Sequence, residues 1–275
     1  MQLMRAPSPR LRPFVQALWA MAPEEGTAAT RHGAREHVLP TGAMHLVFRL
    51  SGPPLRVFDR TTDMSGHTLG HAIVSGARSS FYARDVSQPT HSVGALLRPG
   101  AALALFGAPE DALAGHHTPL DALWGGTQAG LAQERLLATG GLAQQLALFE
   151  TLLQERLVNC FHGLHPAVAQ ALAPLMQGTL SVSQVAARSG YSPRRFIALF
   201  RGATGLAPKE FAGLQRLERV LALAADPRRG WAEIAMDTGF YDQAHMTHAF
   251  SAFAGLAPQA WRRAAVPASP RHVPR

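Results

Sequence analysis

The sequence predicts an α+β protein with two domains. The N-terminal domain is expected to be β-rich, a sandwich or barrel-like fold with added helices, and the C-terminal domain to be all-α, with two helix-turn-helix units joined by a long helix. Three observations predict this: short apolar runs between turn residues fill the N-terminal part, the apolar spacing becomes helical after Arg98, and the C-terminal part repeats itself. The 275 residues, 47% of them hydrophobic, suffice for two cores.

The β-rich part extends over residues 11–98. Its apolar runs are separated by Gly, Pro and Ser, as at Ser51-Gly52-Pro53-Pro54, which is typical of strands linked by hairpin or Greek-key turns. We expect strands at residues 37–39, 44–50, 55–58, 72–75, 81–86 and 91–97, and a first strand or helix at residues 14–22.

Residues 99–160 are expected to be helical. Apolar residues at positions 142, 146, 149, 153 and 157 form one stripe on a helix. Such a stripe can pack on the sheet of its own domain or on a second copy of the chain. A homodimer is therefore a candidate assembly, and the oligomeric state stays open.

An internal repeat is the most informative feature. Residues 183–191 match residues 232–240 at an offset of 49, and Gly205-Leu206-Ala207-Pro208 recurs letter for letter at residues 255–258, an offset of 50. One residue is therefore inserted between the two helices of the second copy. Each copy is expected to form a helix, a short glycine turn and a second helix, which is the pattern of a helix-turn-helix.

The ends of these helices carry capping signals. Ser181 with Gln184 forms a capping box, Ser192 and Asp242 can cap the second helices, and Gly190 can supply a left-handed residue. Gly239 is expected to end the first helix of the second copy in the same way. That helix begins after Gly230, which offers no side-chain cap.

The second helix of each copy has an apolar face and an outward face. At 100° per residue, Phe196, Leu199 and Phe200 share one face, and Met246, Ala249 and Phe250 do so in the second copy. The outward faces predict contacts in a DNA major groove, since arginine can bond guanine O6 and N7 together and Gln, His and Thr make more tolerant contacts. The candidate base-reading residues are Arg194, Arg195, Ile197, Ala198, Arg201, Gln243, Ala244, His245, Thr247 and His248.

The charge distribution supports a polyanionic partner. The net charge is +8, and residues 164–275, with 13 basic and 6 acidic residues, carry +7 of it. The alternative for each arginine is that it simply lies on a solvent-exposed helix face and contacts no DNA. Phosphate contacts are expected from Ser192, Lys209, Arg216, Arg219, Arg228, Arg229, Ser251, Arg262 and Arg263.

The long helix between the copies is expected at residues 208–225, with Phe211, Leu214, Leu217, Val220 and Leu221 as apolar anchors. Its length would be about 27 Å, close to the ~34 Å of one DNA turn once the flanking units are added. One chain could therefore place two reading helices in adjacent major-groove segments.

The segment from residue 180 to 263 resembles the DNA-binding domain of AraC/XylS-type transcription regulators. The resemblance depends on Ala186, Gly190-Tyr191-Ser192, Phe196, Phe200, Gly205 to Phe211, Ile234-Ala235, Gly239-Phe240, Phe250 and Pro258. It implies a seven-helix domain in a bacterial, cytoplasmic, nucleoid-associated regulator of transcription. Double-stranded promoter or operator DNA is the expected partner, and RNA polymerase is a further candidate.

The N-terminal part is similar to the sensor domain of a poorly characterised AraC-type subgroup. The matching pieces are residues 13–19, 39–48, 97–102 with 106–107, and 119–124. This implies a small-molecule effector without naming it. The expected organisation is a sensor and dimerisation domain at residues 1–160, a DNA-binding domain at 164–265 and a flexible tail at 266–275.

Enzyme functions are disfavoured. His32, His37, His45, His67, His71 and His91 suggest a cupin-like enzyme fused to the DNA-binding domain, but no His-x-His pair is present. The lone Cys160 excludes an intramolecular disulfide, and no adjacent Cys, Lys or Arg would activate it as an alkyl acceptor. We expect no catalytic residues, no metal and no cofactor.

The remaining alternatives are other binding functions. No apolar run reaches 18 residues, and the stretch at 14–22 is too short and interrupted for a secretory signal, so no membrane partner is expected. A nonspecific architectural DNA-binding protein would share the positive charge but show little sequence preference. A protein–protein adaptor would bind no DNA.

Overall fold

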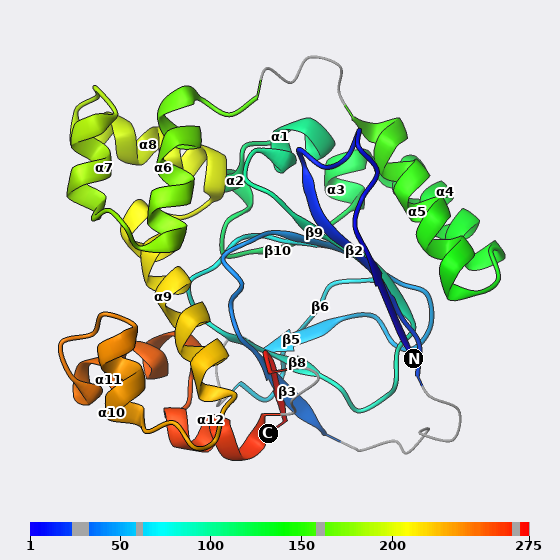
Figure 1. Ribbon diagram of the computed structural model, residues 1–275. Coiled ribbons are helices and arrows are strands. Elements are labelled where there is room, and N and C mark those ends of the chain that lie inside the picture. Colours follow the sequence, from blue (N-terminus) through cyan, green and yellow to red (C-terminus); the bar gives the residue numbers. More distant parts are fainter. Residues whose placement is uncertain (24–32, 59–62, 158–162, 266–269, 275) are drawn as a thin grey trace.

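A computed structural model describes residues 1–23, 33–58, 63–157, 163–265 and 270–274. Its strands form two antiparallel sheets (Figure 1). The six-stranded sheet has the order β1-β2-β9-β4-β7-β10, and the five-stranded sheet has the order β11-β3-β8-β5-β6. The strands are β1 (Gln2–Arg5), β2 (Val15–Met21), β3 (Arg35–Val38), β4 (His45–Arg49), β5 (Arg56–Phe58), β6 (His67–Thr68), β7 (Ala72–Ser75), β8 (Tyr82–Asp85), β9 (Ser92–Leu97), β10 (His117–Pro119) and β11 (His272–Pro274).

The predicted β-rich domain is confirmed, and each expected strand coincides with an observed one. Residues 14–22, for which the sequence allowed a strand or a helix, contain β2. The structure differs within residues 99–160, where helices were expected, because β10 pairs with β7 at the edge of the six-stranded sheet. A strand of three residues is too short to show an alternating hydrophobic pattern in the sequence. Only its pairing with β7 therefore defines β10.

Helices cover one face of the six-stranded sheet. α5 (Leu142–Arg156) packs against β2 and β9, and the ring of Phe149 lies 5.9 Å from that of Phe48 on β4. Leu146, Phe149 and Leu153 are fully buried. The apolar stripe therefore packs on the sheet of its own chain. The other helices of this domain are α1 (Ala101–Phe106), α2 (Glu110–Leu113), α3 (Asp121–Trp124) and α4 (Gly126–Ala138).

The C-terminal domain is helical, with two groups of helices at the two ends of α9 (Figure 1). The capping box of Ser181 and Gln184 is present, and Ser192 and Asp242 cap the helices that follow them. Gly190 and Gly239 have φ of 73° and 74°, as expected for residues that end a helix. The helices are α6 (Pro166–Gln177), α7 (Val182–Arg188), α8 (Pro193–Thr204), α9 (Pro208–Ala224), α10 (Trp231–Asp237), α11 (Gln243–Ala254) and α12 (Pro258–Ala264).

Helix α10 lacks a side-chain cap, as the sequence predicts, because Gly230 occupies its N-cap. Gly230 has extended backbone angles, and a Cβ atom there would meet nothing within 4 Å. We expect Gly230→Ser to raise the free energy of unfolding by about 0.5–1 kcal/mol, measured by urea denaturation, since the hydroxyl can accept from a free N–H of the first turn. Gly230→Ala supplies no acceptor, and an equal gain in both variants would contradict the capping explanation.

The end of the chain differs from the expected flexible tail. Within its described part, residues 272–274 form β11, which pairs antiparallel with β3 of the N-terminal domain. Val273 is buried, and Arg271 donates to the carbonyl of Pro40 and forms an ion pair with Glu218 of α9. The prolines and arginines of this segment predict a frayed end. The segment is ordered instead because it pairs with the open edge of β3 and buries Val273.

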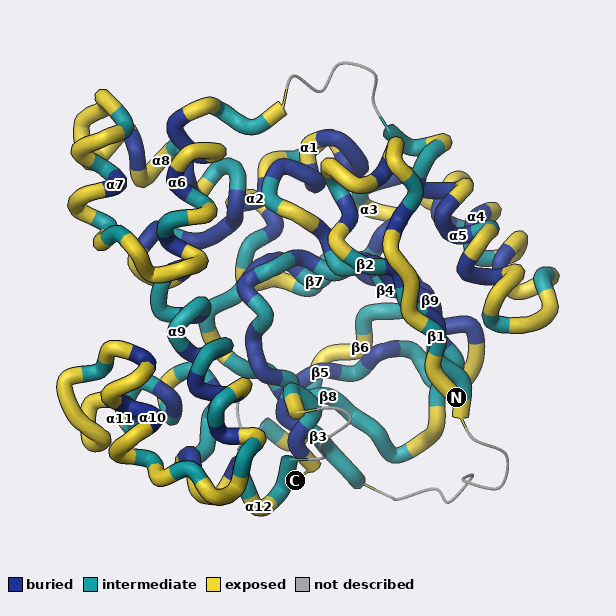
Figure 2. Tube along the Cα trace, viewed as in Figure 1, coloured by how far each residue is buried: buried dark blue, intermediate teal, exposed yellow. Residues whose placement is uncertain are grey.

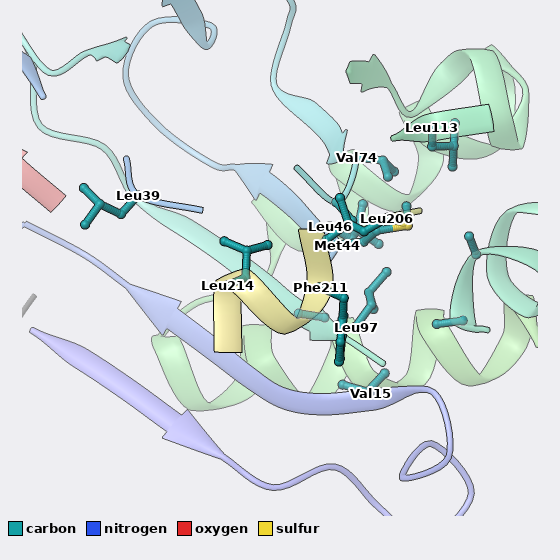
Figure 3. Packing of buried hydrophobic residues seen from close by; sticks show 14 of the residues in the cluster. Val15, Leu39, Met44, Leu46, Val74, Leu97, Leu113, Leu206, Phe211 and Leu214 are labelled. Atoms are coloured by element: carbon teal, nitrogen blue, oxygen red, sulfur yellow. The ribbon is translucent and has the colours of Figure 1, made fainter. Parts of the chain in front are cut away.

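The two domains share one hydrophobic core. Leu206, Phe211 and Leu214 of the C-terminal domain belong to the same cluster as Met44 and Leu46 of the N-terminal domain (Figure 3). Leu214 lies against the backbone of Gly42, where an added Cβ would be 3.1 Å from Leu214 Cδ1. None of the described helices is both long and apolar enough to span a lipid bilayer.

A buried carboxyl group lies beside this interface and makes stability depend on pH. Glu110 on α2, which packs against α8, is 2% exposed and accepts from the amide of Ala102 at 3.0 Å. Burial raises the pKa of Glu110 from 4.5 to about 7. The folded state therefore holds this proton more tightly than the unfolded chain. The resulting stabilisation is complete below pH 4.5 and is lost as the pH rises through about 7.

Glu110→Gln, which cannot ionise, should therefore lose less stability than the wild type as the pH rises through this window in urea unfolding. Burial lowers the pKa of His45 to about 4 and that of His117 to about 3, so their contribution is present above pH 6.5 and lost as the pH falls. Both histidines are retained in the variant, so the difference between the two curves isolates Glu110. Parallel curves would show that Glu110 does not titrate in this range.

Candidate nucleic-acid interface

The two halves of the repeat form two helix-turn-helix units. In the first unit, residues 189–192 connect α7 to α8, and in the second, residues 238–242 connect α10 to α11. The turn of the second unit is one residue longer, which is the insertion that the change of offset from 49 to 50 predicts. The C-terminal domain therefore presents two second helices, α8 and α11, which we call the reading helices.

The reading helices are held by the apolar faces that the helical wheel predicts. Phe196 and Phe200 of α8 are fully buried, and the ring of Phe200 lies 5.4 Å from that of Phe211 on α9. In the second unit Met246 and Phe250 are buried, and Phe250 lies 6.0 Å from Trp261 on α12. This packing fixes which face of each helix is exposed.

The opposite faces point to solvent, as the exposed segments of Figure 2 show. Nine of the ten candidate base-reading side chains are exposed, and Thr247 is half-buried. His245 packs edge-on against Phe240, with ring centroids 5.3 Å apart. The structure therefore brings each half of the candidate set onto one accessible helix face.

The two faces differ in charge. Arg194, Arg195 and Arg201 on α8 are exposed, and within the described part of the chain their side chains form no hydrogen bond or ion pair. α11 carries no arginine or lysine, and its outward residues include Gln243 and His248. Free guanidinium groups are the side chains best suited to guanine and phosphate, so α8 has the stronger potential for DNA contacts.

The candidate phosphate-contacting residues fall into two groups. Several arginines bond within the domain: Arg219 to the carbonyl of Gln177, Arg228 to Asp226, and Arg229 to Glu233 and Asp237. The Arg216 guanidinium lies over the ring of Phe240 and that of Arg262 over Trp231. Lys209 and Arg263 are exposed without a side-chain partner in the described residues, as is Ser192 apart from its cap, and Ser251 is half-buried.

Two exposed side chains beside the reading helices are absent from the sequence-based set. Arg188 ends α7 and has no side-chain partner among the described residues, and Tyr241, which precedes the cap of α11, is 91% exposed. The signal that could have found them is their position in or next to the turn between the two helices. Residues in this turn flank the N-terminus of the reading helix, where helix-turn-helix proteins meet the DNA backbone.

Comparison with protein families decides the assignment of this domain. Residues 185–264 match the model of a helix-turn-helix domain, and this segment contains both units of the structure. This segment is a helix-turn-helix domain of the AraC type. The match confirms the resemblance that the repeat and the Gly-Leu-Ala-Pro turns indicate. The protein is a DNA-binding regulator of transcription with an N-terminal regulatory domain.

The N-terminal domain matches a second family model. Residues 4–119 match a domain of unknown function (DUF6597). This segment contains the six-stranded sheet, apart from the first two residues of β1, and all strands of the five-stranded sheet except β11. A comparison of the sequence with curated proteins found no match.

Three solved structures of other proteins are similar in part. The C-terminal domain of AraT, a response regulator from Geobacillus stearothermophilus, is 23% identical, covers 36% of this chain and 86% of its own, and gives a TM-score of 0.34. The DNA-binding domain of AdpA, a global transcriptional factor in complex with a target DNA, is 27% identical, with 36% and 93% covered and a TM-score of 0.34. ToxT from Vibrio cholerae is 7% identical over 84% of this chain and 96% of its own, with a TM-score of 0.43. All three scores lie below 0.5, so the assignment depends on the family match and on the two units.

Proposed function

We propose that the protein reads one sequence-specific operator through two adjacent major-groove segments, with α8 in the first and α11 in the second. The observation that carries this proposal is the pair of exposed outward faces, held on the same 17-residue helix α9 by buried aromatic residues. The helix spans about 25 Å, and the units at its ends bring the spacing near the ~34 Å of one DNA turn.

Recognition is proposed to be unequal between the two units. Arg194, Arg195 and Arg201 offer bidentate donors on α8, whereas α11 offers Gln243, His245, Thr247 and His248. The first unit would then contribute most of the discrimination between bases. Lys209 and Arg263, which are unpaired in the described structure, would mainly position the domain on the phosphates.

Selection from random duplex DNA with the purified full-length chain tests this proposal. The selected duplex is then titrated against scrambled duplex at two salt concentrations, because affinity for DNA depends on salt. We expect two short motifs about one helical turn apart, bound at least ~1000-fold more tightly than scrambled DNA. Equal binding of all duplexes would favour a nonspecific architectural protein, and no binding at either salt concentration would favour an adaptor.

We propose further that an effector binds between the two sheets of the N-terminal domain. On β4, Leu46 and Phe48 are fully buried on the face under the helices. On the other face His45 and Val47 are half-buried and Arg49 is buried. That face looks toward the five-stranded sheet, because His117, in the same cross-strand row as His45, packs against Tyr82 of β8 with ring centroids 4.5 Å apart. Around His45 and Val47 this face is therefore less buried than the helix-covered side, whereas Ile73, opposite Val47 on β7, is 2% exposed.

The chemistry of this face limits the effector class. Burial lowers the pKa of both His45 and His117 well below 7, so each is neutral and offers hydrogen bonds without charge. The half-buried Trp19 and Leu96 add apolar surface on the same face. A small molecule with a polar end and an apolar body fits this lining. A thermal-shift screen of such compounds should find ligands whose stabilisation disappears in His45→Leu; stabilisation unchanged in that variant would place the site elsewhere.

The remaining partners follow from the same proposal. Regulation would take place in the bacterial cytoplasm, at the nucleoid, through contact with promoter DNA and with RNA polymerase, and without a catalytic step. A homodimer through the N-terminal domain would double the number of reading helices. Sedimentation of the free chain and of its operator complex measures this state.

A further inference from the structure

The N-terminal domain contacts the two reading helices at equivalent positions of the repeat. The amide of Gly100 donates to the carbonyl of Ala203 near the end of α8, at 2.9 Å. The amide of Phe81 donates to the carbonyl of Phe253 near the end of α11, also at 2.9 Å. Residues 203 and 253 differ by 50, which is the offset of the repeat at this point. Both carbonyls belong to the last turn of a helix, where no intrahelical donor is available.

The glycines that end the two reading helices also face the N-terminal domain. A Cβ on Gly205 would lie 3.1 Å from Cβ of Ala77 and 3.3 Å from that of Ala114. A Cβ on Gly255 would lie 2.3 Å from the ring of Phe81, so this ring lies directly against the glycine backbone. The ring of Phe81 also packs against that of His37, with ring centroids 4.6 Å apart. The repeated Gly-Leu-Ala-Pro turn is therefore a docking point used twice.

The two docking points lie at the two ends of the connection between β7 and β8, and each is next to a different sheet. Gly100 follows β9, and Ala77 follows β7, both strands of the six-stranded sheet. Phe81 immediately precedes β8 of the five-stranded sheet. The same sheet receives β11, and Trp261 of α12 donates to the carbonyl of Pro270 just before that strand. Each helix-turn-helix unit is thus contacted next to a different sheet, although Ala77 and Phe81 belong to one short connection.

We propose that the two reading helices, joined by α9, are each positioned by a contact next to a different sheet, so that a change in the placement of one sheet relative to the other shifts α11 relative to α8. Phe81 is the positioning residue for α11, since its amide and its ring both contact the end of that helix. The inference deepens the proposed regulation and depends on it in one respect: an effector between the sheets would act by changing their separation. The helix placement itself requires no effector and no DNA.

The distance between the reading helices tests the proposal directly. Spin labels are attached to Ala198→Cys on α8 and Ala252→Cys on α11, both exposed positions, in the full chain with Cys160→Ser, and the distance distribution is measured by electron resonance without DNA. We expect one narrow distribution in this background. Phe81→Ala, which removes the ring from Gly255, and Gly255→Ala, whose Cβ would displace it, should each broaden or shift the distribution.

Gly107→Ala is the matched control. Gly107 ends α1 with a φ of 70°, close to the 72° of Gly255, but a Cβ there would meet nothing within 4 Å. It therefore carries the same backbone strain without the contact, and its distribution should equal that of the labelled background. Far-ultraviolet circular dichroism verifies that each variant is folded. An unchanged distribution in folded Phe81→Ala and Gly255→Ala, or a change in Gly107→Ala as large as theirs, would overturn the proposal.

A DNA measurement then separates this inference from the proposed function. Operators in which the two motifs are moved apart by one base pair should be bound more weakly by the wild type, and Phe81→Ala should discriminate less between the two spacings, because its units are less fixed. If the distance distribution changes in the variants but no duplex is preferred, the positioning of α11 by Phe81 is supported and the proposed sequence-specific DNA binding is rejected. If both spacings are bound with the wild-type ratio, Phe81 does not set the spacing.

Discussion

Arg194→Ala is expected to weaken binding to the cognate operator by about 1–3 kcal/mol, a factor of roughly 5 to 150 in Kd, which is the size of a good bidentate contact with guanine. Arg194 lies in the first turn of α8, is exposed and has no side-chain partner in the described structure. Its guanidinium is therefore available without breaking an internal bond. Titration of the labelled operator at fixed salt concentration measures the loss.

Two control variants make this prediction specific. Arg228→Ala removes the same charge from an exposed arginine that already pairs with Asp226, so its effect on operator affinity should be much smaller. His248→Ala on α11 should cost less than Arg194→Ala, because a histidine makes a weaker base contact. Equal losses for Arg194→Ala and His248→Ala would contradict unequal recognition. An equal loss of affinity for scrambled DNA would make Arg194 a phosphate contact.

Leu214→Ala is expected to lower the free energy of unfolding by about 2–5 kcal/mol. Leu214 is fully buried on α9, against Gly42 of the other domain and within the cluster that joins both domains (Figure 3). Truncation would leave a cavity between two backbones that cannot easily close. Because the core is continuous, urea should unfold wild type and variant in a single transition that shifts as a whole.

Leu137→Ala is the matched control for this substitution. It removes the same atoms from a leucine on α4 that is 51% exposed, so its effect should stay near 0.5 kcal/mol. Two separate transitions, with only one of them shifted by Leu214→Ala, would show that the domains unfold independently. A loss as small as that of Leu137→Ala would show that the interface between the domains is loosely packed.

Much of the candidate DNA interface could be predicted from local patterns. The period of Phe196 and Phe200 determines which face of α8 is buried, and the opposite face follows without any knowledge of the rest of the chain. The caps at Ser181 and Asp242 and the positive φ of Gly190 likewise depend on neighbouring residues alone. Such signals act over one or two helical turns, so the sequence carries them completely.

Which arginines form contacts within the domain, and which stay free, could not be predicted in this way. Arg219 contacts the carbonyl of Gln177, 42 residues away, and Arg262 lies over Trp231. In the sequence alone, Arg219 and Arg262 cannot be distinguished from Arg194, because all three are arginines of the same basic domain. Only the packing of α9 and α12 against other helices separates the arginines that hold the domain together from those left for DNA.

The sequence by itself determined two repeated helix-turn-helix units, a strand-rich N-terminal domain and the faces that each reading helix buries and exposes. Hydrophobic period, capping residues and a literal repeat suffice for this, because each is a short-range property of the chain. Only the tertiary structure decided that β10 and β11 are strands, that both domains share one core and that Gly205 and Gly255 dock at the two ends of the connection between β7 and β8. These features depend on a partner far away in sequence, and the free energy of burying Val273 or pairing an open strand edge is absent until that partner is in place.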